Sequence, residues 1–109
     1  MAHDPLPSRL DPHTVDRMAE TFRALGDPTR VRIVAALHER ERSVGELAGM
    51  AGVSPSAVSH QLAHLRSLRL VRTRRVGHRV LYRLDDEHVS RLWSVALEHV
   101  RHESTEGPS

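Results

Sequence analysis

The spacing of apolar side chains predicts helices at both ends of the chain and in its middle. From Thr14 to Leu25, apolar residues recur with helical spacing, and Gly26 ends the run. A second helix is expected over residues 28–39, because Asp27 can cap it and a proline suits its first turn. This second helix is apolar around much of its circumference, so we expect it to be buried.

Two short helices are expected next. Ser43 and Glu46 have the spacing of a capping box, and Gly52 ends this helix. Ser54 and Pro55 then start another helix, whose apolar side chains share an arc of about 60° while small polar residues lie opposite. Two short helices joined by a tight turn in this way describe a helix-turn-helix. The apolar residues of the second one are Val58, Leu62 and Leu65.

The period changes after Leu70, where apolar and polar residues alternate over 71–84 around Gly77-His78. This pattern predicts a β-hairpin with an arginine-rich tip. A helix-turn-helix followed by a basic hairpin is a winged helix-turn-helix, so the expected fold class is mostly α with a β-hairpin wing. We expect this domain to cover residues 14–103, with a flexible N-terminal arm at 1–13 and a disordered tail at 104–109.

The basic charge is concentrated on the predicted DNA-binding module. All sixteen basic residues are arginine, and seven of them lie between Leu47 and Leu84, where no Asp or Glu occurs. Such a cluster indicates a surface that faces phosphates, although a solvated basic face is the alternative. The candidate DNA contacts are Ser54, Ser56, Ser59, His60 and Gln61 on the helix and Arg74, Arg75, His78 and Arg79 on the wing. Gln61 lies nearer the buried side, so a structural role is the stronger alternative for it.

One recognition helix offers few base contacts, so proteins of this kind usually bind two half-sites as dimers. The first and last helices are amphipathic and lie outside the DNA-binding pair, so we expect a homodimer that forms through them. The chain contains no cysteine, which excludes disulfides and thiolate metal sites. No apolar run is long enough to span a bilayer, so we expect a cytoplasmic protein without membrane contact.

The last helix, expected from Asp86 to Glu103, carries oxygen and nitrogen donors in two pairs. Asp86 and His88 lie at its start, and His99 and His102 lie at its end. His88 and His99 share a helix face but are about 16 Å apart along the axis, too far to bind one ion. Each pair can chelate locally, the first if Asp86 occupies the non-helical cap.

Two half-sites at opposite ends of a helix complete each other when an identical helix packs antiparallel against it. A dimer would then hold two sites, each with three nitrogens and one carboxylate oxygen, a set that suits tetrahedral zinc. The structural alternative is that acids are favoured at any helix N-terminus and histidines near the C-terminus complement the helix dipole.

Taken together, the chain resembles the ArsR/SmtB family of bacterial metal-responsive repressors over nearly all of residues 14–103. The segments that carry the likeness are "ALGDPTRVRIVAAL", "SVGELA", "SPSAVSHQLAHLRSLRLV", "GHRVLYRLDDEHV" and "ALEHVRH". The resemblance implies a winged-helix dimer that represses its operon at an imperfect inverted repeat. It also implies that metal binding weakens DNA binding and releases transcription.

The resemblance further sorts the candidate metal sites. Family members that sense arsenic, cadmium or lead carry a cysteine pair before the recognition helix, where this chain has Ser43 and Gly45. Zinc sensors carry an Asp-x-His and a later His-x-x-His, and the four candidate ligands of the last helix match that pattern. In relatives, the histidine that corresponds to His99 donates to a carbonyl near the end of the recognition helix, which is that of Arg69 in this chain.

The expected ion is therefore Zn²⁺, with Co²⁺ or Ni²⁺ as alternatives. Nickel- and cobalt-responsive relatives add ligands from the chain ends, so a contribution from His3 or His13 stays open. A repressor whose histidines are merely interfacial is a second alternative. A zinc hydrolase is disfavoured, because four protein ligands leave no position for water, and we expect no enzyme activity.

Overall fold

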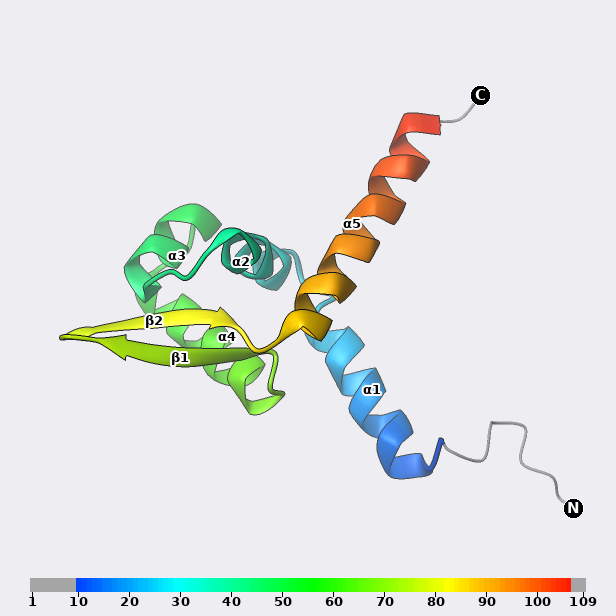
Figure 1. Ribbon diagram of the computed structural model, residues 1–109, viewed down its shortest axis with the longest axis horizontal. Helices are drawn as coiled ribbons and strands as arrows, with labels where there is room; N and C mark the ends of the chain where they lie inside the picture. The colour runs from blue at the N-terminus through cyan, green and yellow to red at the C-terminus, as the bar shows by residue number, and fades with distance from the viewer. Residues whose placement is uncertain (1–9, 107–109) are drawn as a thin grey trace, which may run out of the picture.

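The computed structural model of the chain describes residues 10–106, with side chains as far as residue 102. Within this range, helices and one antiparallel hairpin follow each other in the predicted order (Figure 1). The mostly α fold with a hairpin wing is thereby confirmed. The elements are α1 (Pro12–Ala24), α2 (Pro28–Glu39), α3 (Val44–Ala51), α4 (Pro55–Ser67), β1 (Val71–Val76), β2 (Arg79–Leu84) and α5 (Glu87–Glu106).

The predicted caps start the central helices. Asp27 accepts the backbone N–H of Arg30 at 3.1 Å at the start of α2. At α3, Ser43 Oγ accepts the N–H of Glu46 while Glu46 Oε1 accepts the N–H of Ser43, which confirms the capping box. These reciprocal bonds satisfy N–H groups that have no partner inside the helix, so the sequence alone fixes where the helix begins.

Helix α1 begins two residues before the predicted Thr14. Asp11 is its cap, because its carboxylate accepts the N–H of Thr14 at 2.8 Å, and Pro12 occupies the first turn. Pro12 and His13, which the sequence analysis places in the N-terminal arm, are therefore part of α1. The rest of that segment, residues 1–9, lies outside the described residues.

Helix α5 ends three residues after the predicted Glu103, at Glu106. No glycine or proline interrupts the chain before Gly107-Pro108, so nothing in the local sequence stops the helix earlier. The expected disordered tail is therefore helical over 104–106, and residues 107–109 lie outside the described part of the chain.

The hydrophobic core lies between α2, α3, α4 and the hairpin. We call these elements together the central unit. Val58, Leu62 and Leu65 on the inner face of α4 are fully buried, as predicted, against Ile33 of α2 and Leu47 of α3. The strands pair antiparallel from Val71–Leu84 at the base to Val76–Arg79 at the tip. Gly77 is the first turn residue and has φ 63°, a conformation that favours glycine.

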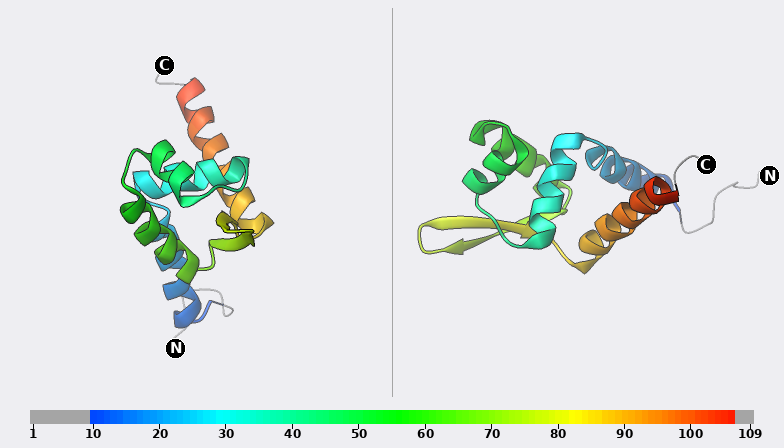
Figure 2. Two further views of the ribbon diagram at one scale, coloured as in Figure 1. Left: turned by 90° about the vertical axis from the view of Figure 1, so that its left-hand side faces the viewer. Right: turned by 90° about the horizontal axis from the view of Figure 1, so that it is seen from above.

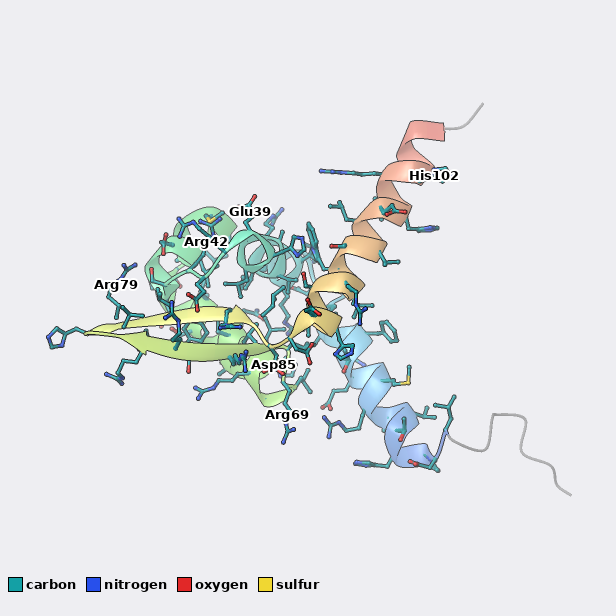
Figure 3. All side chains as sticks on the ribbon, viewed as in Figure 1. Glu39, Arg42, Arg69, Arg79, Asp85 and His102 are labelled. Carbon is teal, nitrogen blue, oxygen red and sulfur yellow. The ribbon has the colours of Figure 1, made fainter. Side chains whose placement is uncertain are left out.

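A buried arginine attaches the hairpin to α2. The backbone of Arg42 pairs with that of Tyr82 in β2. Its Nε donates to the carbonyl of Ala36 at 3.0 Å, and its Nη2 pairs with Glu39 (Figure 3). The guanidinium donates to a main-chain carbonyl and to a carboxylate in the last turn of α2. Because its charge and donors are partnered in this way, Arg42 is buried at low cost.

Helices α1 and α5 are the flanking helices, and they lie on the side of the molecule away from the hairpin tip (Figures 1 and 2). Each contributes one buried apolar residue to the core, Ala24 from α1 and Val89 from α5. Their other apolar side chains are largely exposed, including Phe22 of α1 and Val95 of α5. No described helix combines the length and apolar character that crossing a membrane requires.

Candidate functional site

The outer face of α4 presents short polar side chains. Ser56, Ser59 and His60 are all exposed on the N-terminal half of the helix, as predicted for a surface that enters a DNA groove. Ser54 is differently placed, because its Oγ accepts the N–H of Ala57 at 3.1 Å and caps the helix. Its side chain is therefore already used for helix formation.

Gln61 is half-buried between α4 and α2. Its Oε1 accepts a hydrogen bond from Nε of Arg30 at 2.5 Å. Arg30 was not singled out in the sequence, although an arginine in a helix expected to be buried is a signal that it has an internal partner. Gln61 therefore has the structural role that was the alternative to a DNA contact: it joins α4 to α2 through Arg30.

The wing combines a paired arginine with exposed ones. Nε and Nη2 of Arg74 donate to the two carboxylate oxygens of Glu41, at 2.9 and 2.5 Å. The hydrogen bond from Arg74 holds the pKa of Glu41 below its usual value. Arg75 and His78 are exposed near the tip (Arg79, which begins β2, has its Nη2 3.7 Å from Glu46). Arg75 is therefore a stronger candidate for a phosphate contact than Arg74, because Arg74 is already paired with a carboxylate.

The structure brings the first pair of candidate ligands together at the start of α5. Asp86 Oδ1 accepts the backbone N–H groups of His88 at 2.8 Å and Val89 at 3.2 Å, so Asp86 occupies the non-helical cap, which is the condition for local chelation. Its Oδ2 lies 3.3 Å from His88 Nδ1. The hydrogen bond with the His88 side chain, followed by the one from the Val89 N–H, lowers the pKa of Asp86.

This spacing fits a tetrahedral ion. Two ligand atoms at about 2.0–2.1 Å from zinc are about 3.3–3.4 Å apart when the angle between them is tetrahedral. The Oδ2 to Nδ1 distance of 3.3 Å lies in that range. Because Oδ1 serves the cap, Oδ2 is the oxygen that can act as a ligand without uncapping the helix.

The second pair lies near the other end of α5. His99 and His102 are exposed and are separated by three positions, so they share one helix face (Figure 3 labels His102). Within the described residues of one chain, no group of three or more His, Asp or Glu side chains could hold a metal ion. The described residues of one chain therefore complete no three-ligand site, and the pairing of two half-sites across a dimer stays a prediction.

Arg69, two residues after the end of α4, has an unusual backbone conformation. Its φ of 58° is the left-handed value, which is otherwise found only at glycines among the described residues. The N–H of Leu70 donates to the carbonyl of Leu65 at 2.9 Å, which closes a Schellman turn. The carbonyl of Leu70 then accepts the N–H of Asp85 at 3.0 Å, next to Asp86 (Figure 3). The hydrogen bond from His99 to the Arg69 carbonyl stays a prediction.

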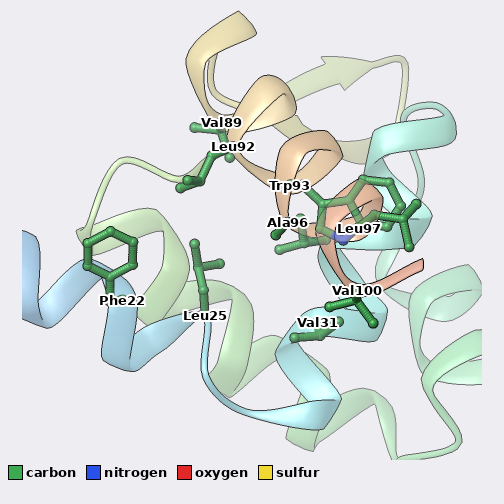
Figure 4. A pocket seen from close by; sticks show the side chains of 10 residues that line it. Phe22, Leu25, Val31, Val89, Leu92, Trp93, Ala96, Leu97 and Val100 are labelled. Carbon is green, nitrogen blue, oxygen red and sulfur yellow. The ribbon is translucent and has the colours of Figure 1, made fainter. Parts of the chain in front are cut away.

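An apolar groove separates the flanking helices. It has a volume of about 420 Å³ and is lined by side chains from α1, α2 and α5 (Figure 4). Phe22, Leu92 and Val100 lie at its edge and are exposed. The groove and the exposed apolar side chains around it are the part of the described chain where a partner could cover apolar surface.

Comparison with known proteins gives consistent results. A model of the arsR family of bacterial regulatory proteins matches residues 27–73. The transcriptional repressor SmtB homolog of a Synechocystis species is 51% identical over 85 residues, which are 78% of this chain and 64% of that relative. The chain therefore spans less than two thirds of that relative's length. The regulator KmtR of Mycobacterium tuberculosis is 46% identical over 99 residues, 91% of this chain and 73% of that relative.

Among solved structures, a homodimeric winged helix-turn-helix DNA-binding domain from Mycobacterium bovis matches with a TM-score of 0.77 and 33% identity. The match covers 92% of this chain and 96% of that domain. The fold and these relatives define the class of the protein: they are winged helix-turn-helix transcriptional regulators rather than enzymes. Within that class, the chain belongs to the ArsR/SmtB family of bacterial regulatory proteins, which confirms the resemblance seen in its sequence.

Proposed function

We propose that the chain is a homodimeric, zinc-responsive transcriptional repressor that acts in the cytoplasm at an inverted-repeat operator. The observation that carries the metal assignment is the 3.3 Å spacing of Asp86 Oδ2 and His88 Nδ1 at the cap of α5. The second half of the ligand set, His99 and His102, would come from α5 of the partner. Two such sites per dimer follow from the twofold symmetry.

The dimer in this proposal forms through the flanking helices. Their apolar side chains line a groove that a second copy of α1 and α5 can fill, and the similar domain from Mycobacterium bovis is described as homodimeric. An antiparallel arrangement of the two α5 helices would place each start beside the other's end. The sequence spacing of eleven residues between His88 and His99 requires that arrangement.

DNA binding is assigned to the outer face of α4 and to the wing. Ser56, Ser59 and His60 would contact the major groove, while Arg75, His78 and Arg79 would contact phosphates or the adjacent minor groove. Arg74 has two of its five N–H donors on Glu41, so it would reach a phosphate only with its remaining ones. Zinc, when bound, supplies a fixed four-ligand link between the subunits. If it favours the dimer conformation with low DNA affinity, a change of about 5–150-fold is typical of allosteric coupling.

The test is fluorescence anisotropy on a labelled upstream palindrome, titrated with Zn²⁺, Co²⁺ and Ni²⁺ in turn. Wild-type protein should bind without metal and be released by zinc at lower concentrations than by nickel. His88→Ala and His99→Ala should bind DNA without metal as wild type does but lose the release. The control is His64→Ala, an exposed histidine on α4 that should keep it.

Direct metal binding separates the alternatives. Equilibrium dialysis should give two zinc ions per dimer for wild type, and Co²⁺ should show the absorption bands of a tetrahedral complex. Octahedral Co²⁺ spectra together with release by nickel would instead favour a nickel- or cobalt-responsive repressor that uses further ligands. A protein that binds the palindrome but neither ion would be a repressor without metal sensing.

A further inference from the structure

Arg30 joins three helices through one guanidinium group. Its Nε donates to Gln61 Oε1 at 2.5 Å, and its Nη1 donates to the carbonyl of Ala24 at 3.2 Å. Ala24 is the last residue of α1, Arg30 lies in the first turn of α2, and Gln61 lies in the middle of α4. The recognition helix is therefore tied to a flanking helix through a single side chain.

The same contact fixes the orientation of the Gln61 amide. A guanidinium has donors only, so the atom that faces Arg30 is the amide oxygen and the NH₂ group is directed away. In the described part of the chain, Nε2 of Gln61 has no hydrogen-bond partner. Every buried side-chain nitrogen or oxygen among these residues does have a partner, so Nε2 of Gln61 is not buried. The NH₂ group of Gln61 is consequently open to solvent.

We propose that Arg30 makes Gln61 a donor-only contact to DNA, with the NH₂ group directed at an acceptor on the operator. This inference rests on the proposed function. A glutamine that recognises adenine uses both amide atoms, because its oxygen must accept from N6 while its nitrogen donates to N7. Arg30 holds the oxygen of Gln61 inward, so the two-atom adenine contact is lost. A phosphate oxygen or a base acceptor is the partner that the remaining donors fit.

The arrangement also lowers the cost of the contact. A charge-assisted hydrogen bond is stronger than one between neutral groups, so the Gln61 side chain is held in place before DNA binds. Ordering a free glutamine at the interface would otherwise reduce affinity. Arg30 is thus a positioning residue, and Gln61 is the residue that would touch DNA.

The first test compares Gln61→Glu and Gln61→Leu with wild type. Gln61→Glu keeps the contact with Arg30 as an ion pair but carries no donor, so its midpoint of urea unfolding should not fall while its affinity for the palindrome falls at least about tenfold. Gln61→Leu removes the donor without adding charge and should lose about 5–10-fold in affinity. Wild-type affinity of Gln61→Leu would overturn the inference.

A random duplex of equal length identifies the acceptor. Equal losses on the random duplex and on the palindrome indicate a phosphate oxygen, and a loss on the palindrome alone indicates a base. A wild-type protein that binds neither duplex would overturn the proposed function and this inference with it. If the wild-type protein binds both duplexes and Gln61→Leu binds them with the same affinity, this inference is overturned and the proposed function is not.

The second test asks whether Arg30 acts through Gln61. Arg30→Met should reduce affinity, and Arg30→Lys should recover most of it because a lysine can still donate to the Gln61 oxygen. In a Gln61→Leu background, Arg30→Met should cause no further loss of DNA affinity beyond experimental error. Losses that multiply in the double variant would show that Arg30 acts on DNA binding independently of Gln61, which contradicts the proposal.

Discussion

The central unit and the flanking helices differ in how completely they bury their apolar side chains. In the central unit, residues such as Ile33, Leu47 and Leu62 are 0% exposed. In the flanking helices, Phe22 is 58% exposed and Val95 is 66% exposed. The flanking helices have the more amphipathic sequence patterns, but only the central unit finds its packing partners within one chain.

This difference indicates which part of the molecule is complete as a monomer. The central unit encloses its own core, so it owes its stability to contacts within the chain. The flanking helices expose a groove of about 420 Å³, which a second copy would cover in the proposed dimer. Stability and dimerisation can therefore be disrupted separately, and substitutions in the two regions should have different signatures.

The largest effect is expected from a cavity in the central unit. Leu62→Ala removes a fully buried side chain and should lower the free energy of unfolding by about 2–5 kcal/mol in urea denaturation. Leu92→Ala, at the edge of the groove, should cost less than this when measured at low protein concentration, where the monomer dominates. Equal losses for the two variants would mean that the flanking helices are packed as tightly as the core.

A smaller loss is expected at the attachment of the hairpin. Arg42→Met removes the donors to Ala36 and Glu39 while keeping most of the buried stem. Because hydrogen bonds from charged groups contribute more than neutral ones, the free energy of unfolding should fall by about 1.5–3 kcal/mol. Arg40→Met, whose guanidinium is exposed and pairs with Glu46, serves as the control and should change it by less than about 1 kcal/mol.

The flanking region should respond through its oligomeric state. Phe22→Glu places a charge on the apolar surface and should raise the dimer dissociation constant by about tenfold or more, as measured by analytical ultracentrifugation. The control is Met50→Glu, because Met50 is similarly exposed but lies on α3 in the central unit. If both variants dimerise as wild type does, the dimer forms through another surface.

The smallest effect concerns the ion pair between the wing and the loop before α3. Glu41→Gln releases Arg74, so DNA affinity should rise a few-fold and the slope of log affinity against log salt should steepen by about one. An unchanged slope in this variant, with a flatter slope in Arg75→Ala, would assign the phosphate contact to Arg75 alone.

The same pair gives a pH dependence. The pKa of Glu41 is lower in the folded chain than its usual value of 4.5, so its stabilising contribution is present above that value and is lost as the pH falls through the folded pKa. Wild-type stability should therefore fall more steeply than that of Glu41→Gln between about pH 5 and pH 3. Parallel curves would show that the pair contributes nothing to folding.

The features that the sequence predicted correctly depend on neighbouring residues. The capping box of Ser43 and Glu46 and the buried face of α4 involve residues within a few positions of each other. The Asp86–His88 contact is of the same kind. The sequence pattern predicts the start of α1 at Thr14, two residues too late, although Asp11-Pro12 carries the same start signal as Asp27-Pro28.

The features that the sequence did not predict join distant residues. The Arg30–Gln61 contact spans 31 positions and the Arg74–Glu41 pair spans 33. No period or motif encodes which acid or amide such an arginine meets, since that choice depends on how the helices pack. Charge clustering therefore located the arginines of the hairpin but did not reveal that Arg74 is paired with Glu41.

The left-handed backbone at Arg69 has a consequence for how such a regulator can diversify. Because Leu70 is bonded through its carbonyl to the N–H of Asp85, a displacement of the α5 cap pulls on main-chain atoms at the exit of α4. Main-chain linkage does not depend on the identity of the side chains along it. In the proposed repressor, the outward residues of α4 could therefore change to suit a different operator without altering this hydrogen bond.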